Sequence, residues 1–170
     1  MDSFSVVVMG VSGCGKSSLA REIATALGRP MIEGDDFHGA ENKALMAAGT
    51  PLTDALRADW LETLGQQLTR YPGGAVLSCS ALKKRYRDQL RVASKGLRFV
   101  YLELSPEDAL ERVRGRASGH FFPGTLVASQ FEALEPPGDE PGVLSLDATE
   151  SPSTLVQAAL AWIEQQDNVR

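Results

Sequence analysis

The chain has 170 residues, the length of one domain of ordinary size. Its composition, 43% hydrophobic and 23% charged, is typical of a globular protein and argues against a disordered, fibrous or disulfide-stapled chain. The net charge of −5 provides no overall field that would attract nucleic acid or an anionic membrane, so we expect neither as a partner. Any bound anion must therefore be met by local positive charge.

The compartment is suggested by cysteine usage and by the absence of targeting signals. The two cysteines, Cys14 and Cys79, are far apart in sequence and too few for a secreted disulfide framework. No apolar run approaches membrane-spanning length, and the chain does not start with a basic region followed by an apolar stretch. We therefore expect a cytoplasmic protein.

Short apolar runs alternate along the chain with segments of helical periodicity. In chain order these are a strand at 4–9, a helix at 16–27, a brief strand at 31–32, helices at about 41–47 and 54–70, a strand at 75–79, a polar and basic helix at 82–93, a strand at 97–104, helices at 106–114 and 125–134, a strand at 143–146 and a helix at 153–165. Such alternation implies βαβ crossovers, so the predicted fold class is α/β with a parallel sheet and helices on both faces.

Two segments fall outside this pattern. Residues 115–123 hold no periodicity and are predicted to form a mobile loop, and the proline- and glycine-containing connector at 135–142 is too short to be a domain linker. We therefore expect a single domain over residues 1–170.

A phosphate-binding loop stands between the first strand and the first helix. Residues 10–17, GVSGCGKS, satisfy the pattern G-x-x-x-x-G-K-[ST] in the context that the pattern requires. Backbone N–H groups and the start of the helix favour phosphate, Lys16 reaches the β- and γ-phosphates, and the hydroxyl of Ser17 is a hard ligand for Mg²⁺. The predicted nucleotide-binding residues are Gly10, Ser12, Gly13, Cys14, Gly15, Lys16, Ser17 and Ser18.

The loop alone leaves several classes of protein open. A GTPase would need a guanine-reading Asn-Lys-x-Asp segment, which the sequence lacks, and the third strand ends in LSCS without the acid of a typical ATPase. Glu103, after the fourth strand, is interpreted as an ordinary strand-end residue. A module that binds nucleotide without catalysis stays an alternative, although the acids that follow the second strand argue against it.

Three acids follow the second strand: Glu33, Asp35 and Asp36. In an open α/β sheet this position lies at the carboxyl edge, beside the phosphate loop. One carboxylate there can accept the proton of an acceptor hydroxyl, and another can hold a Mg²⁺-bound water. A solvated turn is the alternative interpretation.

Several further motifs resemble, in order and spacing, those of the gluconokinase family of P-loop small-molecule kinases. They are GDDFH at 34–38 followed by Asn42 and Met46, PLTD at 51–54 followed by Arg57 and Trp60, CSALKKRYRD at 79–88, GHFF at 119–122, SQFE at 129–132 and LEPP at 134–137. The resemblance spans about residues 6–137 and is much more specific than the phosphate loop.

This resemblance implies a three-layer αβα fold with a five-stranded parallel sheet, similar to nucleoside monophosphate and shikimate kinases, with a mobile lid at about 115–125. It also implies ATP- and Mg²⁺-dependent phosphorylation of D-gluconate at the 6-hydroxyl to 6-phosphogluconate, in gluconate catabolism that feeds the pentose phosphate pathway. A homodimer is common in the family. A nucleoside monophosphate kinase is the alternative enzyme.

Residue roles follow from the resemblance and from charge. Asp35 falls on the position of the acceptor-side base, and Arg57, Lys83 and Arg87 are natural partners for an acid, the last two sharing one face of the expected helix. A solvated helix face is the alternative for that basic run. The predicted catalytic residues are Lys16, Asp35 and Arg116; the predicted substrate contacts are Asp35, His38, Asn42, Arg57, Ser80, Lys83, Arg87, His120 and Gln130; and the predicted metal ligands are Ser17 and Glu33.

The lid departs from the family pattern. Two residues separate Arg116 from Gly119 where one is usual, so Arg112 and Arg114 compete with Arg116 for the position that faces the transferring phosphate. Thr53, Ala55 and Asp59 also differ from the common residues without touching the proposed chemistry.

Overall fold

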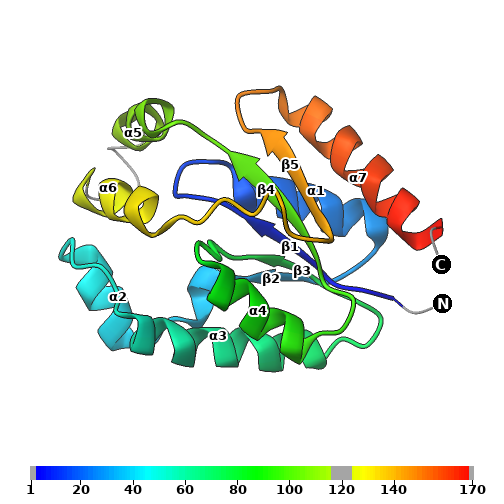
Figure 1. Ribbon diagram of the computed structural model, residues 1–170, viewed down its shortest axis with the longest axis horizontal. Helices are drawn as coiled ribbons and strands as arrows, with labels where there is room; N and C mark the ends of the chain where they lie inside the picture. Colours follow the sequence, from blue (N-terminus) through cyan, green and yellow to red (C-terminus); the bar gives the residue numbers. More distant parts are fainter. Residues whose placement is uncertain (1–2, 116–123, 169–170) are drawn as a thin grey trace.

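The computed structural model describes residues 3–115 and 124–168 of the chain. It contains a five-stranded parallel sheet in the order β2-β3-β1-β4-β5 (Figure 1). The strands are β1 Val6–Met9, β2 Met31–Glu33, β3 Val76–Ser78, β4 Arg98–Glu103 and β5 Val143–Asp147. The helices are α1 Lys16–Leu27, η1 Gly34–Phe37 (3₁₀), α2 Ala40–Ala47, α3 Asp54–Thr69, α4 Lys84–Ala93, α5 Pro106–Gly115, α6 Gly124–Ala133 and α7 Pro152–Asn168.

Helices cover both faces of the sheet, which gives the predicted three-layer αβα architecture. Successive side chains of β1 point to opposite faces. Val6 and Val8 join the core beneath α1 and α7, whereas Val7 and Met9 join the core against α3 and α4. Figure 1 shows these two helix pairs on opposite sides of the sheet. Because both faces are covered, all four side chains are buried, as the unbroken apolar sequence of this strand predicts.

The carboxyl ends of the five strands meet at one edge and carry the segments that matter for function. The phosphate loop follows β1, η1 follows β2, residues 79–83 follow β3, and residues 148–151 follow β5. Helices α2 and α6 face each other across this edge (Figure 1). Ligands of open α/β sheets bind at this edge, so the topology brings residues distant in sequence into one place.

Predicted and observed elements agree closely, and two differences affect the site. The acid-rich segment after β2 forms the 3₁₀ helix η1. Helix α4 begins at Lys84, two residues later than predicted, because Ala81 adopts a positive φ of 46° and Lys83 is extended. Consequently Lys83 precedes the helix, and the expected common helix face of Lys83 and Arg87 does not exist.

Helix α3 begins where the sequence provides a cap. The side chain of Thr53 accepts a hydrogen bond from the backbone N–H of Leu56 at 3.2 Å, and Asp54 adds a negative charge to the first turn. This start places Arg57 in the first turns of the helix, at the carboxyl edge of the sheet. Within the described part of the chain, no helix is long and apolar enough to span a bilayer.

Candidate active site

The phosphate loop has the backbone geometry that an anion needs. Gly15 at the N-terminus of α1 has a φ of 92° and provides no side-chain cap, so the first N–H groups of the helix lack a side-chain acceptor there. A Cβ atom on Gly10 would lie 2.7 Å from Sγ of Cys14 and 2.9 Å from the carbonyl oxygen of Leu102, so only glycine fits. Cys14 is buried, and its backbone N–H donates to the carbonyl oxygen of Val11 at 3.2 Å.

A cleft of about 720 Å³ lies on one side of the loop, between α1 and the residues after β5. Arg112 of α5 borders it and donates hydrogen bonds to the carbonyl oxygens of Gly13 at 3.0 Å and Ala148 at 2.9 Å. Arg112 thus joins the phosphate loop to the segment after β5. The lining includes the predicted residues Cys14, Gly15 and Ser18, and also Ala148 and Pro152, which match no motif that sequence reasoning could use.

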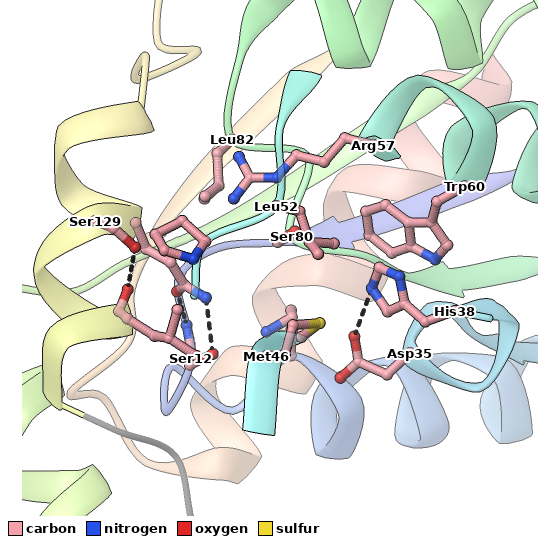
Figure 2. Close-up of a pocket in the computed structure, with 14 residues that line it drawn as sticks. Ser12, Asp35, His38, Met46, Leu52, Arg57, Trp60, Ser80, Leu82 and Ser129 are labelled. Atoms are coloured by element: carbon pink, nitrogen blue, oxygen red, sulfur yellow. Dashed lines mark hydrogen bonds and ion pairs between the residues drawn. The ribbon is translucent and has the colours of Figure 1, made fainter. Parts of the chain in front are cut away.

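A second, smaller cleft of about 150 Å³ lies on the other side of the loop (Figure 2). Its walls come from the phosphate loop, η1, α2, α3, the segment after β3, and α6. Seven of the predicted residues border it: Ser12, Lys16, Asp35, His38, Arg57, Ser80 and Gln130. Tertiary folding therefore gathers the loop lysine, a carboxylate and an arginine around one small space that apolar side chains also line.

Asp35 and His38 lie together at one end of this cleft. Nε2 of His38 is 4.0 Å from Oδ1 of Asp35, and its ring stacks on Trp60 with 4.2 Å between centroids. Burial lowers the pKa of His38, Lys43 and Arg57 lower it further, and the Asp35 carboxylate opposes them. The imidazole is therefore neutral at neutral pH, while the exposed carboxylate of Asp35 is open to an acceptor hydroxyl.

Close packing against β3 fixes the position of η1, which carries Asp35. A Cβ atom on Gly34 would lie only 2.5 Å from the carbonyl oxygen of Ser78, so a larger residue cannot be accommodated without a shift. On the other side, Nε1 of Trp60 donates a buried hydrogen bond to the carbonyl oxygen of Gly34 at 2.8 Å. The backbone of the GDDFH motif is therefore held at Gly34 between β3 and Trp60.

Arg57 belongs to a charged cluster centred on Asp54. Nη1 of Arg57 donates to the hydroxyl of Tyr86 at 3.4 Å, and that hydroxyl donates to Oδ1 of Asp54. Lys83 and Arg85 also donate to Asp54, at 3.1 and 2.6 Å. The hydrogen bonds from Tyr86 and Lys83 hold the pKa of Asp54 below its ordinary value. Lys83 therefore lies beside the cleft, tied to Asp54, and does not border it.

Gln130 connects α6 to the phosphate loop. The backbone N–H of Ser12 donates to Oε1 of Gln130 at 2.7 Å, and Nε2 of Gln130 donates to Oγ of Ser12 at 3.1 Å (Figure 2). This two-point contact holds the SQFE motif against the loop beside the smaller cleft.

The predicted metal ligands lie near each other below the loop. The hydroxyls of Ser17 and Ser78 are 3.2 Å apart, and Ser78 pairs in the sheet with Glu33. Among the described residues, no group of three or more His, Cys, Asp or Glu side chains could hold a metal ion. These oxygens therefore fit a cation that takes most of its ligands from phosphate and water.

Cys79 is buried near the charged side chains of Asp35, Lys16 and Glu33. Burial raises the pKa of the Cys79 thiol to about 12, and Asp35 and Glu33 act in the same direction, whereas Lys16 opposes them. The thiol is therefore protonated, and we assign it no chemical role.

One predicted substrate contact is wrong. The side chain of Arg87 is fully buried, and its guanidinium is bonded to Glu140 and to the carbonyl oxygens of Ala81, Leu82 and Glu135. Local sequence cannot separate such an arginine from one that faces a ligand.

Three other predicted contacts have different outcomes. Asn42 lies on α2 but does not border the cleft, whereas Met46, one turn later, does. Arg116 and His120 lie outside the described residues, and the predicted loop at 115–123 lies almost wholly outside them. Lys84 and Arg85, which belong to the same basic run, are exposed.

The fold and the phosphate loop, with a cleft on either side of it, define a P-loop kinase of small molecules. Comparison with known proteins agrees. The sequence model of the shikimate kinase family matches residues 12–122. The chain is 40% identical to a gluconokinase of Gluconobacter oxydans over 166 residues, 95% of this chain and 92% of the relative.

Further relatives support a narrower assignment. The chain is 42% identical to the thermosensitive gluconokinase of Escherichia coli over 147 residues, 84% of this chain and 78% of the relative. A crystal structure of a gluconokinase from Sinorhizobium meliloti 1021 superposes with a TM-score of 0.90 at 43% identity and covers 99% of this chain and 96% of that chain. The chain belongs to the gluconokinase family.

Proposed function

We propose that this chain transfers the γ-phosphoryl group of ATP to the 6-hydroxyl of D-gluconate, producing 6-phosphogluconate and ADP in gluconate catabolism, which feeds the pentose phosphate pathway. The smaller cleft, of about 150 Å³, is the proposed acceptor cleft. The observation that carries the proposal is that Lys16, Asp35 and Arg57 converge there beside the phosphate loop. The names of the relatives supply the acceptor.

The larger cleft, of about 720 Å³, is the proposed nucleotide cleft, and together with the phosphate loop it suits ATP. The start of α1 and the loop N–H groups favour the phosphates, and the space bordered by Arg112 and Ala148 suits the nucleoside. When bound with ATP, Mg²⁺ neutralises charge on the phosphates. Ser17 would hold it directly, and Glu33 would hold it through water.

The acceptor cleft fits a small anionic polyol. Arg57 would pair with the gluconate carboxylate, since a guanidinium binds a carboxylate in a bidentate geometry. His38, Ser80 and Gln130 offer polar atoms for hydroxyl groups. Asp35 would accept the proton of the 6-hydroxyl, although most of the catalysis in phosphoryl transfer comes from positioning and charge. Arg116 stays the predicted lid arginine.

The test is a coupled assay of ADP formation with gluconate, shikimate, glycerate and nucleoside monophosphates as acceptors. Shikimate is a necessary competitor because the shikimate kinase model matches residues 12–122. We expect turnover with gluconate; turnover only with shikimate or a nucleotide would overturn the acceptor assignment.

We further propose a single kinase domain over residues 1–170, a homodimer and a cytoplasmic location. The five strands share one sheet, which supports a single domain. The dimer follows from the family resemblance alone, and light scattering coupled to size-exclusion chromatography tests it.

A further inference from the structure

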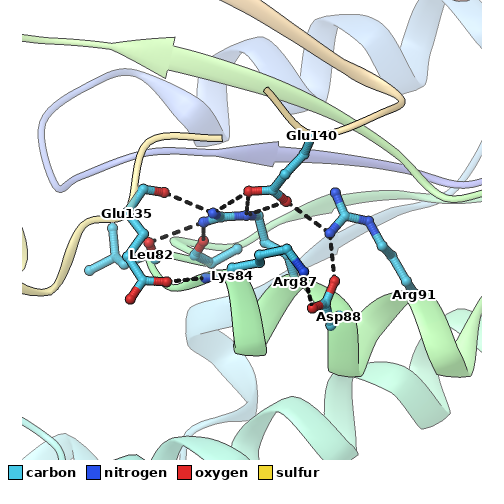
Figure 3. A network of polar contacts seen from close by, with 8 residues as sticks. Leu82, Lys84, Arg87, Asp88, Arg91, Glu135 and Glu140 are labelled. Atoms are coloured by element: carbon cyan, nitrogen blue, oxygen red, sulfur yellow. Dashed lines mark hydrogen bonds and ion pairs between the residues drawn. The ribbon is translucent and has the colours of Figure 1, made fainter. Parts of the chain in front are cut away.

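A fully buried arginine joins the segment after β3, which borders the acceptor cleft, to the segment that follows α6. Nε and Nη2 of Arg87 donate to Oε1 and Oε2 of Glu140 at 3.0 and 2.6 Å (Figure 3). Nη1 donates to the carbonyl oxygens of Ala81 and Leu82 at 2.8 and 3.0 Å, and Nη2 also donates to that of Glu135 at 2.8 Å. One guanidinium therefore fixes the segment after β3 and the segment after α6 together.

Glu140, the carboxylate partner of Arg87, is also largely buried and paired. The side chain of Glu140 is only 10% exposed and also forms an ion pair with Arg91, with 2.9 Å between Nη1 and Oε1. Burial alone would raise the pKa of Glu140, but the hydrogen bonds and charges of Arg87 and Arg91 hold it below its ordinary value. The carboxylate is therefore ionised at neutral pH and matches the buried guanidinium charge.

One of the joined segments borders the acceptor cleft, and the other follows α6, which also borders it. Ser80 and Leu82, on either side of Ala81, border it directly. Ala81 itself has a φ of 46°, a conformation that is uncommon for a residue with a Cβ atom and needs support from its surroundings. The two carbonyl bonds from Arg87, on Ala81 and Leu82, provide that support.

Backbone contacts complete the connection. The N–H of Glu135 donates to the carbonyl oxygen of Leu82 at 2.8 Å, and the N–H of Lys84 donates to Oε1 of Glu135 at 2.9 Å. Glu135 lies shortly after α6, which carries Gln130 against the phosphate loop. A shift in this region would therefore move the acceptor wall formed by Ser80 and Leu82.

Stability alone is a weak explanation for this arrangement. A buried ion pair often contributes little more than well-packed apolar side chains of the same volume. What an apolar pair could not do is orient three carbonyl groups from two irregular segments. The planar fork of arginine does this, and the ammonium group of lysine cannot.

We propose that Arg87, with Glu140, is a positioning residue for the acceptor: it sets the 80–82 wall of the acceptor cleft without touching the substrate. The proposal rests on the proposed kinase function. It assigns a role to a residue that the sequence alone placed in direct contact with substrate.

The test compares Arg87→Lys, Glu140→Gln and a matched destabilised control, Ile163→Ala. Ile163 is buried on α7, which packs against α1 and β5, so its truncation is expected to lower stability at a distance from the Arg87–Glu140 pair. Steady-state kinetics well below each melting temperature give the KM of the acceptor, and calorimetric titration gives the Kd of an ATP analogue. We expect Arg87→Lys and Glu140→Gln to raise the acceptor KM about tenfold, with the nucleotide Kd within about twofold of wild type.

The control should show a lowered melting temperature and an unchanged acceptor KM. An unchanged acceptor KM in Arg87→Lys and Glu140→Gln, or an equal rise in Ile163→Ala, would assign the pair to stability alone. If a buried variant does not fold, Glu135→Ala decides the question, because this exposed substitution removes only the side-chain bond to Lys84. We expect an acceptor KM about threefold higher there; a wild-type value would overturn the proposal.

The acceptor used is whichever compound the wild-type enzyme phosphorylates best. If wild type does not use gluconate, the proposed function fails, whereas the comparison of variants still tests Arg87.

Discussion

Substitution of Gly34 by alanine tests whether the placement of η1 controls the chemistry. The added methyl group would lie 2.5 Å from the carbonyl oxygen of Ser78, nearly 1 Å inside an ordinary contact. Because that oxygen belongs to the central sheet, η1 must move instead. Such overpacking costs about 1–3 kcal/mol of stability, and the shift carries Asp35 with it.

The expected kinetic effect is large relative to the size of the change. A misplacement of about 1 Å at a reacting group costs on the order of 10²-fold in rate, so we expect kcat to fall by about that factor. The nucleotide cleft lies on the other side of the phosphate loop, so the Kd of an ATP analogue should stay near the wild-type value. Stopped-time ADP assays and calorimetric titration measure the two quantities.

Gly39→Ala provides the matched control. Gly39 lies five residues further on, and a Cβ atom there meets nothing within 4 Å. We expect its kcat to stay close to wild type. A wild-type kcat for Gly34→Ala, or a loss confined to nucleotide affinity, would refute the link between η1 packing and catalysis.

Three further outcomes are expected. Asp35→Asn should lower kcat by about 10²-fold with unaltered nucleotide affinity, and an unchanged kcat would remove Asp35 from the role of base. Arg57→Ala should raise the gluconate KM without changing that of ATP; a defect on the ATP side alone would contradict its assignment. Glu140 has a pKa below its ordinary 4.5, so its stabilisation is present above about pH 4.5 and is lost as the pH falls through the folded-state value. Urea unfolding midpoints of wild type and Glu140→Gln should therefore differ at pH 7 and approach each other as the pH falls below 4.5, and a gap that stays constant would exclude this linkage.

Local features of the sequence were sufficient to predict the α/β fold and the phosphate loop. Apolar runs reveal strands, because burial on both faces demands continuous apolar residues, and the phosphate loop is encoded by glycines and a lysine within eight positions. Asp35, predicted from its place after a strand, and His38, predicted from the family resemblance, both border the smaller cleft at the carboxyl edge of the sheet.

Only the tertiary structure decided which cations border the proposed acceptor cleft. Lys83 and Arg87 stand in one basic run, yet Lys83 is tied to Asp54, 29 residues away, and Arg87 to Glu140, 53 residues away. Arg112 likewise finds its partners on the phosphate loop and after β5. The sequence by itself determined the nucleotide loop, the parallel α/β frame and the acids beside it, because local backbone preference and burial encode them. The direction in which each charged side chain points depends on partners that only folding brings within a few ångströms.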